Sequence, residues 1–131
     1  MLREAIQMLP NFLVEEATVR ECGESAPFAL GEQSDQNLLV TLGITHAMEQ
    51  ESLEVDIFLS KDGLSWPHQP AVSFTQKFYC GTYQMTVPAD GARFLKAEWR
   101  VNRWARRESR PFFRFYVFAQ AVRQHAMAGA A

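Results

Sequence analysis

The sequence contains few of the residues that disulfide frameworks, metal sites and membrane spans require. Its two cysteines, Cys22 and Cys80, lie far apart and belong to no Cys-x-x-Cys pair, so we expect reduced thiols, buried or idle, and not a disulfide. Its three histidines, His46, His68 and His125, lack the spacing of a metal-binding motif. No apolar run approaches the roughly 18 residues of a membrane span. We therefore predict no metal site, no cofactor and no association with a membrane.

Arrangements that support catalysis are also missing. The sequence has no glycine-rich phosphate loop and no Gly-x-Ser-x-Gly elbow. Cys80 precedes Gly81, but strand cysteines are commonly core residues, and no partnered histidine is evident. The adjacent acids Glu15 and Glu16 would point to opposite faces of a strand. We therefore predict no catalytic residue and a protein that is not an enzyme.

Length and composition indicate one ordinary globular domain. The chain has 131 residues, of which 47% are hydrophobic and 21% charged, which suits a single domain over 1–131. Residues 1–10 are expected to form an arm or a short helix, and residues 124–131 a frayed tail. The first ten residues carry Glu4 and an apolar run too short for a secretory signal. A cytoplasmic location is therefore expected.

The sequence contains a regular pattern in place of such motifs. In several segments, apolar residues recur at every second position. In residues 52–60, Leu53, Val55, Ile57 and Leu59 share one face. Such alternation is typical of strands with one buried face, and one solvated face per strand favours antiparallel sheets. The runs expected to form strands are 12–22, 37–48, 52–60, 70–76, 78–88, 93–104 and 111–122. The predicted fold is all-β, an antiparallel, jelly-roll-like β-sandwich of about seven to eight strands.

The segment Ser60–Trp66 carries Asp62-Gly63 between two of these runs. Asp-Gly favours a tight hairpin turn because glycine accepts positive φ, and this would place Trp66 at the start of the next strand. The pattern Ser-x-Asp-Gly-x-x-Trp, with the downstream GARFLKAEWRV, resembles the hairpin of discoidin-type, galactose-binding-like jelly rolls. The resemblance implies a jelly-roll fold and a largely structural motif, since ligands or calcium contact other loops in that family. Two interpretations of Trp66 stay open: it closes the end of a core, or it lies in a sugar-contacting loop.

Charge is unevenly distributed along the chain, although the formal net charge is only −2. Residues 1–62 carry twelve acidic and three basic residues, whereas residues 63–131 carry ten basic and three acidic ones. Two interpretations remain open. Acidic strands could pair with basic strands within one sheet, or the molecule could present one acidic and one basic surface suited to head-to-tail association or an anionic partner.

Residues 98–118, EWRVNRWARRESRPFFRFYVF, combine arginine with aromatic residues. Arginine binds carboxylates and phosphates through paired hydrogen bonds and stacks on aromatic rings. The segment could form a long hairpin with arginines paired to Glu54, Asp56 and Glu98, a surface for a protein partner, or a surface for a polyanion. Nucleic acid is the least expected partner because no RNA-binding signature is present. The residues predicted to bind a ligand or partner are Trp66, Trp99, Trp104, Arg100, Arg103, Arg106, Arg107, Arg110 and Tyr116.

The last predicted strand carries aromatic residues on both faces. Phe113 and Phe115 share one face, and Phe112, Tyr116 and Phe118 share the other. A sheet with one solvated face needs only one such set, so we expect the second set to meet another layer or another chain. We therefore predict a non-catalytic binding or assembly protein, a self-associating structural or adaptor subunit of bacterial or phage type that forms a homo-oligomer or binds a protein partner. The alternatives are a carbohydrate-binding module that uses exposed tryptophans and a polyanion-binding protein that uses residues 100–114.

Overall fold

Nine strands form most of the described chain. The computed structural model describes residues 9–31, 36–48, 50–103 and 112–122, and within these residues it contains no α-helix. The strands are β1 (Asn11–Val19), β2 (Gly23–Glu24), β3 (Phe28–Ala29), β4 (Asn37–His46), β5 (Glu51–Ser60), β6 (Val72–Lys77), β7 (Gly81–Pro88), β8 (Phe94–Arg103) and β9 (Phe113–Val122). The predicted all-β class is confirmed.

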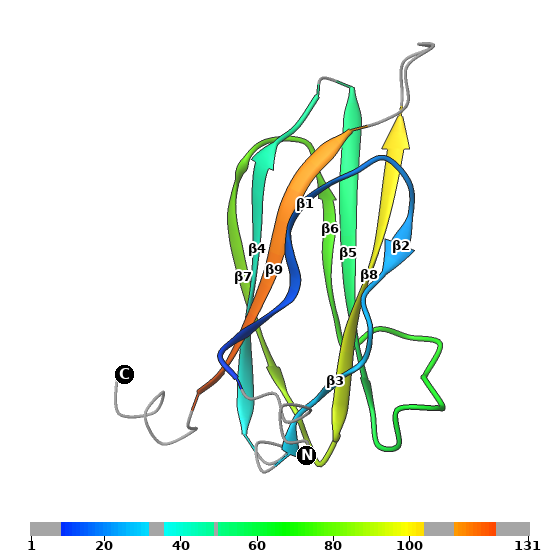
Figure 1. The fold of residues 1–131 in the computed structure, drawn as a ribbon, viewed down its shortest axis with the longest axis vertical. Helices are drawn as coiled ribbons and strands as arrows, with labels where there is room; N and C mark the ends of the chain where they lie inside the picture. The colour runs from blue at the N-terminus through cyan, green and yellow to red at the C-terminus, as the bar shows by residue number, and fades with distance from the viewer. Residues whose placement is uncertain (1–8, 32–35, 49, 104–111, 123–131) are drawn as a thin grey trace, which may run out of the picture.

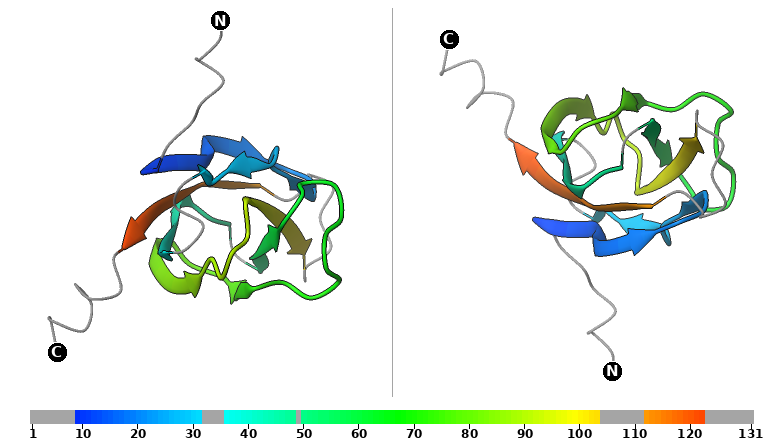
Figure 2. Two further views of the ribbon diagram at one scale, coloured as in Figure 1. Left: turned by 90° about the horizontal axis from the view of Figure 1, so that it is seen from below. Right: turned by 90° about the horizontal axis from the view of Figure 1, so that it is seen from above.

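The strands form two sheets that face each other (Figures 1 and 2). Sheet A has the order β1-β9-β4-β7, and sheet B has the order β2-β8-β5-β6, with β3 also pairing with β8. All strand pairs are antiparallel. The chain crosses to the opposite sheet after each strand, except between β2 and β3 and between β5 and β6, and this is the connectivity of a jelly roll. The predicted antiparallel sandwich of jelly-roll type is confirmed.

The core lies between the sheets and consists of the alternating apolar residues. On β4, for example, Leu38, Val40, Leu42 and Ile44 point inward and are buried. The largest fully buried apolar side chains are Phe74, Phe113, Phe115, Leu30, Leu38, Leu42, Leu53, Ile57, Leu95, Val40 and Val55. Truncating a buried side chain of this kind to alanine typically costs about 2–5 kcal/mol. The outward positions of the same strands are therefore the ones free to serve a function.

Two predicted connections are wrong. β5 and β6 pair as expected, with Ile57 opposite Val72, but residues 61–71 join them in place of a tight turn, and Trp66 lies in this connection and in no strand. The strands β8 and β9 do not form a hairpin, because β8 belongs to sheet B and β9 to sheet A. Alternation identifies a strand but says nothing about which strand lies beside it, and a jelly roll separates these two neighbours.

The two ends of the chain lie mostly outside the described residues. The expected arm or short helix at 1–10 is described only at Leu9 and Pro10, and the expected tail at 124–131 is not described. Leu9 is buried and belongs to the core cluster. No helix in the described part of the chain is long and apolar enough to cross a membrane.

Candidate functional site

Arg100 lies at the centre of a group of paired charges on the outer face of sheet B. Its guanidinium lies 2.7 Å from Glu54 Oε1 on β5 and 2.8 Å from Asp56 Oδ2, and Ser73 on β6 donates a hydrogen bond of 2.6 Å to Asp56. The hydrogen bonds to Glu54 and then Asp56 raise the pKa of Arg100. Arg100 is therefore committed to two carboxylates of its own sheet, as the pairing interpretation predicted.

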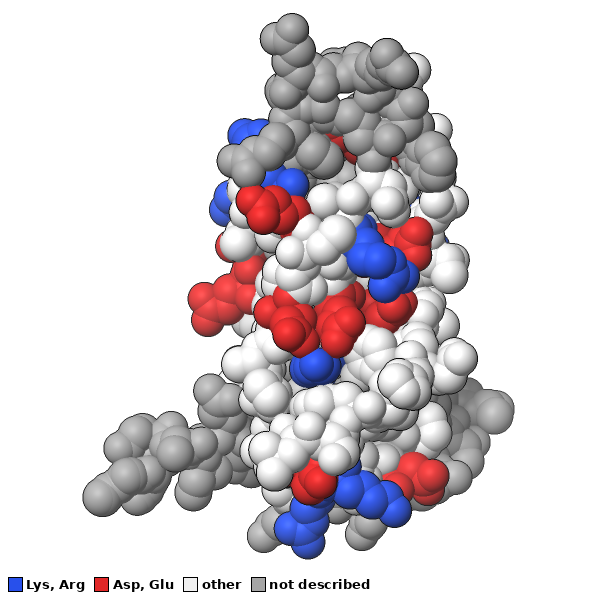
Figure 3. All heavy atoms as spheres, turned by 90° about the vertical axis from the view of Figure 1, so that its right-hand side faces the viewer, with Lys and Arg blue, Asp and Glu red and all other residues white. Residues whose placement is uncertain are grey.

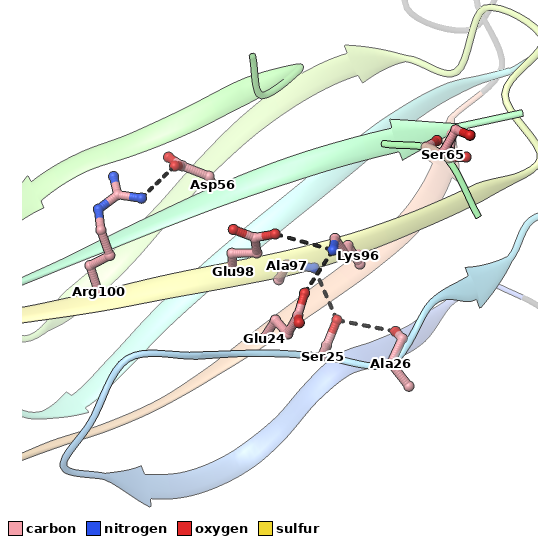
Figure 4. Close-up of polar contacts among 10 residues, drawn as sticks. Glu24, Ser25, Ala26, Asp56, Ser65, Lys96, Ala97, Glu98 and Arg100 are labelled. Carbon is pink, nitrogen blue, oxygen red and sulfur yellow. Dashed lines mark hydrogen bonds and ion pairs between the residues drawn. The ribbon is translucent and has the colours of Figure 1, made fainter. Parts of the chain in front are cut away.

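Lys96 occupies a second set of contacts on the same face. Its Nζ lies 2.7 Å from Glu24 Oε1 and 3.1 Å from Glu98 Oε2 (Figure 4), and it also lies 4.7 Å from the centroid of the Trp66 ring. The hydrogen bond to Glu24 is the main cause that raises the pKa of Lys96, against the opposing effect of burial. Acidic and basic side chains thus lie beside each other on this side of the molecule (Figure 3). We call this surface, formed by Glu24, Glu54, Asp56, Lys96, Glu98 and Arg100, the charged face.

The residues of the Ser-x-Asp-Gly-x-x-Trp pattern hold the connection 61–71 in shape. The buried Ser60 hydroxyl donates to the Ser65 carbonyl at 2.7 Å and accepts from the Gly63 amide at 2.9 Å. Asp62 Oδ1 accepts the amides of Leu64 and Ser65 at 2.8 and 2.9 Å, and these bonds, that to Ser65 first, lower the pKa of Asp62. Gly63 has a φ of 76°, which favours glycine. Most of the pattern therefore serves the local backbone.

The described tryptophans are both half-buried. The Trp99 indole N–H donates to the Glu21 carbonyl at 3.1 Å, and the ring lies so close over Gly23 that a β-carbon there would stand 2.7 Å from it. Trp99 also contacts Phe115 edge to face, with ring centroids 5.6 Å apart. The Trp66 ring carries Lys96 over it and lies outside the core cluster. Trp66 therefore does not close the end of the core, whereas Trp99 packs against it.

A different group of aromatic rings lies on the outer face of sheet A. Phe12 on β1 contacts Tyr116 and Phe118 on β9, with ring centroids 5.8 and 4.9 Å apart. These three residues, here the aromatic face, line a groove of about 330 Å³ together with Glu16 and Thr41. Phe12 is 43% exposed. The groove is apolar on its aromatic side and has a carboxylate and a hydroxyl at its border.

Gly43 shapes the aromatic face from the neighbouring strand. It lies opposite Tyr116 in the register of β4 and β9, and a β-carbon at position 43 would stand 2.2 Å from the Tyr116 ring. The absence of a side chain on Gly43 thus lets the tyrosine ring lie across β4. The Gln84 amide on β7 donates to the Thr41 hydroxyl at 3.1 Å, beyond Gly43 on the same face.

Three of the four strands of the sheet behind the aromatic face contain almost no charge, and the fourth, β1, carries Glu15 and Glu16. Strands β4, β7 and β9 together contain a single Asp, Glu, Lys or Arg residue, Arg114. The guanidinium of Arg114 lies 2.7 Å from Glu16 on the edge strand β1, and Thr45 donates to the same carboxylate at 3.0 Å. These two hydrogen bonds, that from Arg114 first, lower the pKa of Glu16. The charge of Arg114 is therefore neutralised within the sheet.

The predicted site residues are divided between the two sheets. Trp99 and Arg100 border one groove of about 340 Å³ with Cys22, Gly23, Glu24 and Glu98, while Tyr116 belongs to the aromatic face of sheet A. Arg103 ends β8, but its side chain, with Trp104, Arg106, Arg107 and Arg110, lies outside the described part of the structure. Among the described residues, no group of three His, Cys, Asp or Glu side chains could hold a metal ion.

Phe12, Gly43 and Phe118 were not among the predicted site residues. The alternation of the last strand already placed Phe118 on the same face as Tyr116. Phe12 joins them through the pairing of β1 with β9, which brings Phe12 opposite Phe118. No local pattern in the sequence reports that pairing, so Phe12 and Gly43 could not be recognised in advance.

The architecture is that of a jelly-roll β-sandwich, and solved structures of similar fold are known. No family model and no curated protein matches the chain. The SPBc2 prophage-derived protein YomS is similar in fold, with a TM-score of 0.50 and 11% sequence identity over 89% of this chain and 98% of that chain. At this identity the similarity shows the fold alone.

Proposed function

We propose that this protein is a non-catalytic assembly subunit that associates with further copies of itself. The observation that supports the proposal is the contrast between its two outer faces. The charged face of sheet B satisfies its charges internally, whereas sheet A presents three clustered rings, and its strands β4, β7 and β9 together carry one charged residue. Aromatic residues are enriched and charged residues depleted at the centres of protein interfaces.

The similarity to a prophage-derived protein agrees with a phage-type subunit, but only at the level of the fold. Jelly rolls serve as structural domains of particles and as lectin domains, so the fold does not choose between them. The choice between these functions therefore depends on the properties of the two outer faces. A clustered, partly exposed aromatic patch is a common sign of an interaction site.

The two alternative functions receive less support from the described residues. A sugar platform needs a free ring face, but Lys96 lies over Trp66, and Trp99 covers Gly23. A polyanion surface needs unpaired bases, but Arg100 is bound by Glu54 and Asp56. Assembly is therefore the function that the geometry favours.

Light scattering coupled to size-exclusion chromatography tests the proposal. We expect a mass that rises from one chain toward a multiple of it as the protein concentration increases. The association should persist in high salt, because burial of apolar surface is not screened as exposed ion pairs are. A mass of one chain at every concentration, in low and in high salt, would contradict the proposed function.

A further inference from the structure

We propose that the partner of the aromatic face is the same face of a second copy, related by a two-fold axis, with Phe12 of each copy entering the groove of the other. The inference rests on the proposed self-association and adds the partner, the surface and the anchoring residue. A two-fold interface requires one patch that is complementary to itself. Phe12 supplies a partly exposed ring that forms one wall of a groove of about 330 Å³ on the same patch, so one copy offers both a ring to contact and a recess to receive it.

The distribution of charge favours a second copy over a polyanion as the occupant of the aromatic face. Arg114 is the sole charged residue of β4, β7 and β9, and Glu16 neutralises it. Glu15 on β1 is the one remaining charged residue in the strands of sheet A, so two such faces can stack with little repulsion between like charges. The charged face contains four acidic and two basic side chains, so two copies of it would repel each other. A polyanionic partner would, in turn, find no unpaired base on β4, β7 or β9.

The polar groups beside the rings are already bonded to each other. Gln84 donates to Thr41, and the Arg114 guanidinium and the Thr45 hydroxyl both donate to Glu16. Burying a polar group that keeps its hydrogen bond costs far less than burying one that has lost its partner. Covering these bonded groups therefore needs no matching polar group from the partner, and this suits contact between two identical apolar patches.

Phe12→Ser tests the anchoring residue. We expect the dissociation constant of self-association to rise at least about tenfold, which is the size of effect expected from a buried aromatic anchor at an interface. The matched control is Leu64→Ser, because Leu64 is 86% exposed and lies in the connection 61–71 on the other sheet. Its substitution removes exposed apolar surface of a similar kind and should leave the constant unchanged.

Thr86→Lys is a second test of the same face, for the case in which Phe12→Ser impairs folding. Thr86 is exposed and points outward from β7, so the variant should fold like the natural chain by circular dichroism. It adds a positive charge to the outer face of sheet A, which the proposed dimer would cover, and should also weaken association. If neither Phe12→Ser nor Thr86→Lys changes the constant while the chain still associates, the inference is overturned and the proposed function stands.

A cross-linking experiment distinguishes the faces directly. In a chain carrying Cys22→Ser and Cys80→Ser, Gln120→Cys places one thiol on the outer side of β9, and a short bis-maleimide should link two copies. Thr75→Cys, exposed on β6 of sheet B, should give no link. A link only from position 75 would assign the contact to the other sheet. A chain that stays monomeric, yet binds an immobilised glycan and loses that binding in Phe12→Ser, would assign the aromatic face to a carbohydrate and overturn both proposals.

Discussion

The contact between Gly43 and Tyr116 depends on the absence of one atom, the β-carbon at position 43, and this contact shapes the aromatic face. The tyrosine ring lies where the β-carbon of any other residue at position 43 would stand. We predict that Gly43→Ala destabilises the protein by about 1 kcal/mol, since the ring must leave its place and lose packing. In a Tyr116→Ala background the same change should stabilise the protein by about 0.5–1 kcal/mol, because alanine fixes a strand at a lower entropic cost than glycine. Urea unfolding of the four chains measures both values.

The sign reversal is the informative part of this cycle. Two residues in contact show an interaction energy in a double-mutant cycle, whereas independent residues do not. Equal effects of Gly43→Ala in the two backgrounds would show that the ring does not lie over position 43. Gly23 and Trp99 form an equivalent pair in sheet B, with the ring over the glycine of the opposite strand. A glycine covered by an aromatic ring of the neighbouring strand is therefore found in both sheets.

At the scale of single elements, β5 and β8 are held together by Arg100 on their outer side. We predict that Arg100→Ala lowers the free energy of unfolding by about 1–2 kcal/mol. The value is set below that of a fully buried pair because almost half of the arginine side chain is exposed. Asp56, which is 7% exposed, loses its cationic partner and keeps Ser73. Chemical denaturation gives the value, and Arg93→Ala, in the exposed turn before β8, is the control that should change stability by less than about 0.5 kcal/mol.

The strands were predictable where burial repeats at every second residue. Leu53, Val55 and Ile57 were expected on one face of a strand, and all three are fully buried. The strands β2 and β3 were not expected, because two residues cannot show a period. The aromatic face depended on the pairing of β1 with β9, two elements almost a whole chain length apart. Local patterns predict which residues of a strand face the core, but they do not predict which strands lie beside it.

The connection 61–71 also shows how far a local sequence pattern can predict structure. Asp62 and Gly63 do form a local turn, with positive φ at the glycine as expected. The following residues do not enter the next strand, because Ser60 and Asp62 bind back to Ser65 and prolong the loop. A two-residue signal predicts the turn, while side-chain hydrogen bonds within the loop decide its length.

At the scale of the whole molecule, both thiols are accessible. Cys22 and Cys80 are exposed and form no disulfide with each other, so of the two arrangements expected for reduced thiols, buried or idle, burial is not observed. We predict that a thiol reagent titrates two groups per chain without denaturant, and that prior reduction does not raise the number. A value of two reached only in denaturant would show that one cysteine is covered, for instance by a contact between copies.

The position of β9 sets the order in which the two sheets can be completed during synthesis. β9 is the last strand of the described chain, yet it lies inside sheet A, between β1 and β4. A nascent chain that ends before residue 113 can pair the strands of sheet B, but β1 then lacks its only neighbour in the described sheet. Until β9 leaves the ribosome, β1 and β4 each offer an unsatisfied edge to other chains. This topology therefore exposes the nascent chain to aggregation. The exposure ends when β9 pairs with both β1 and β4.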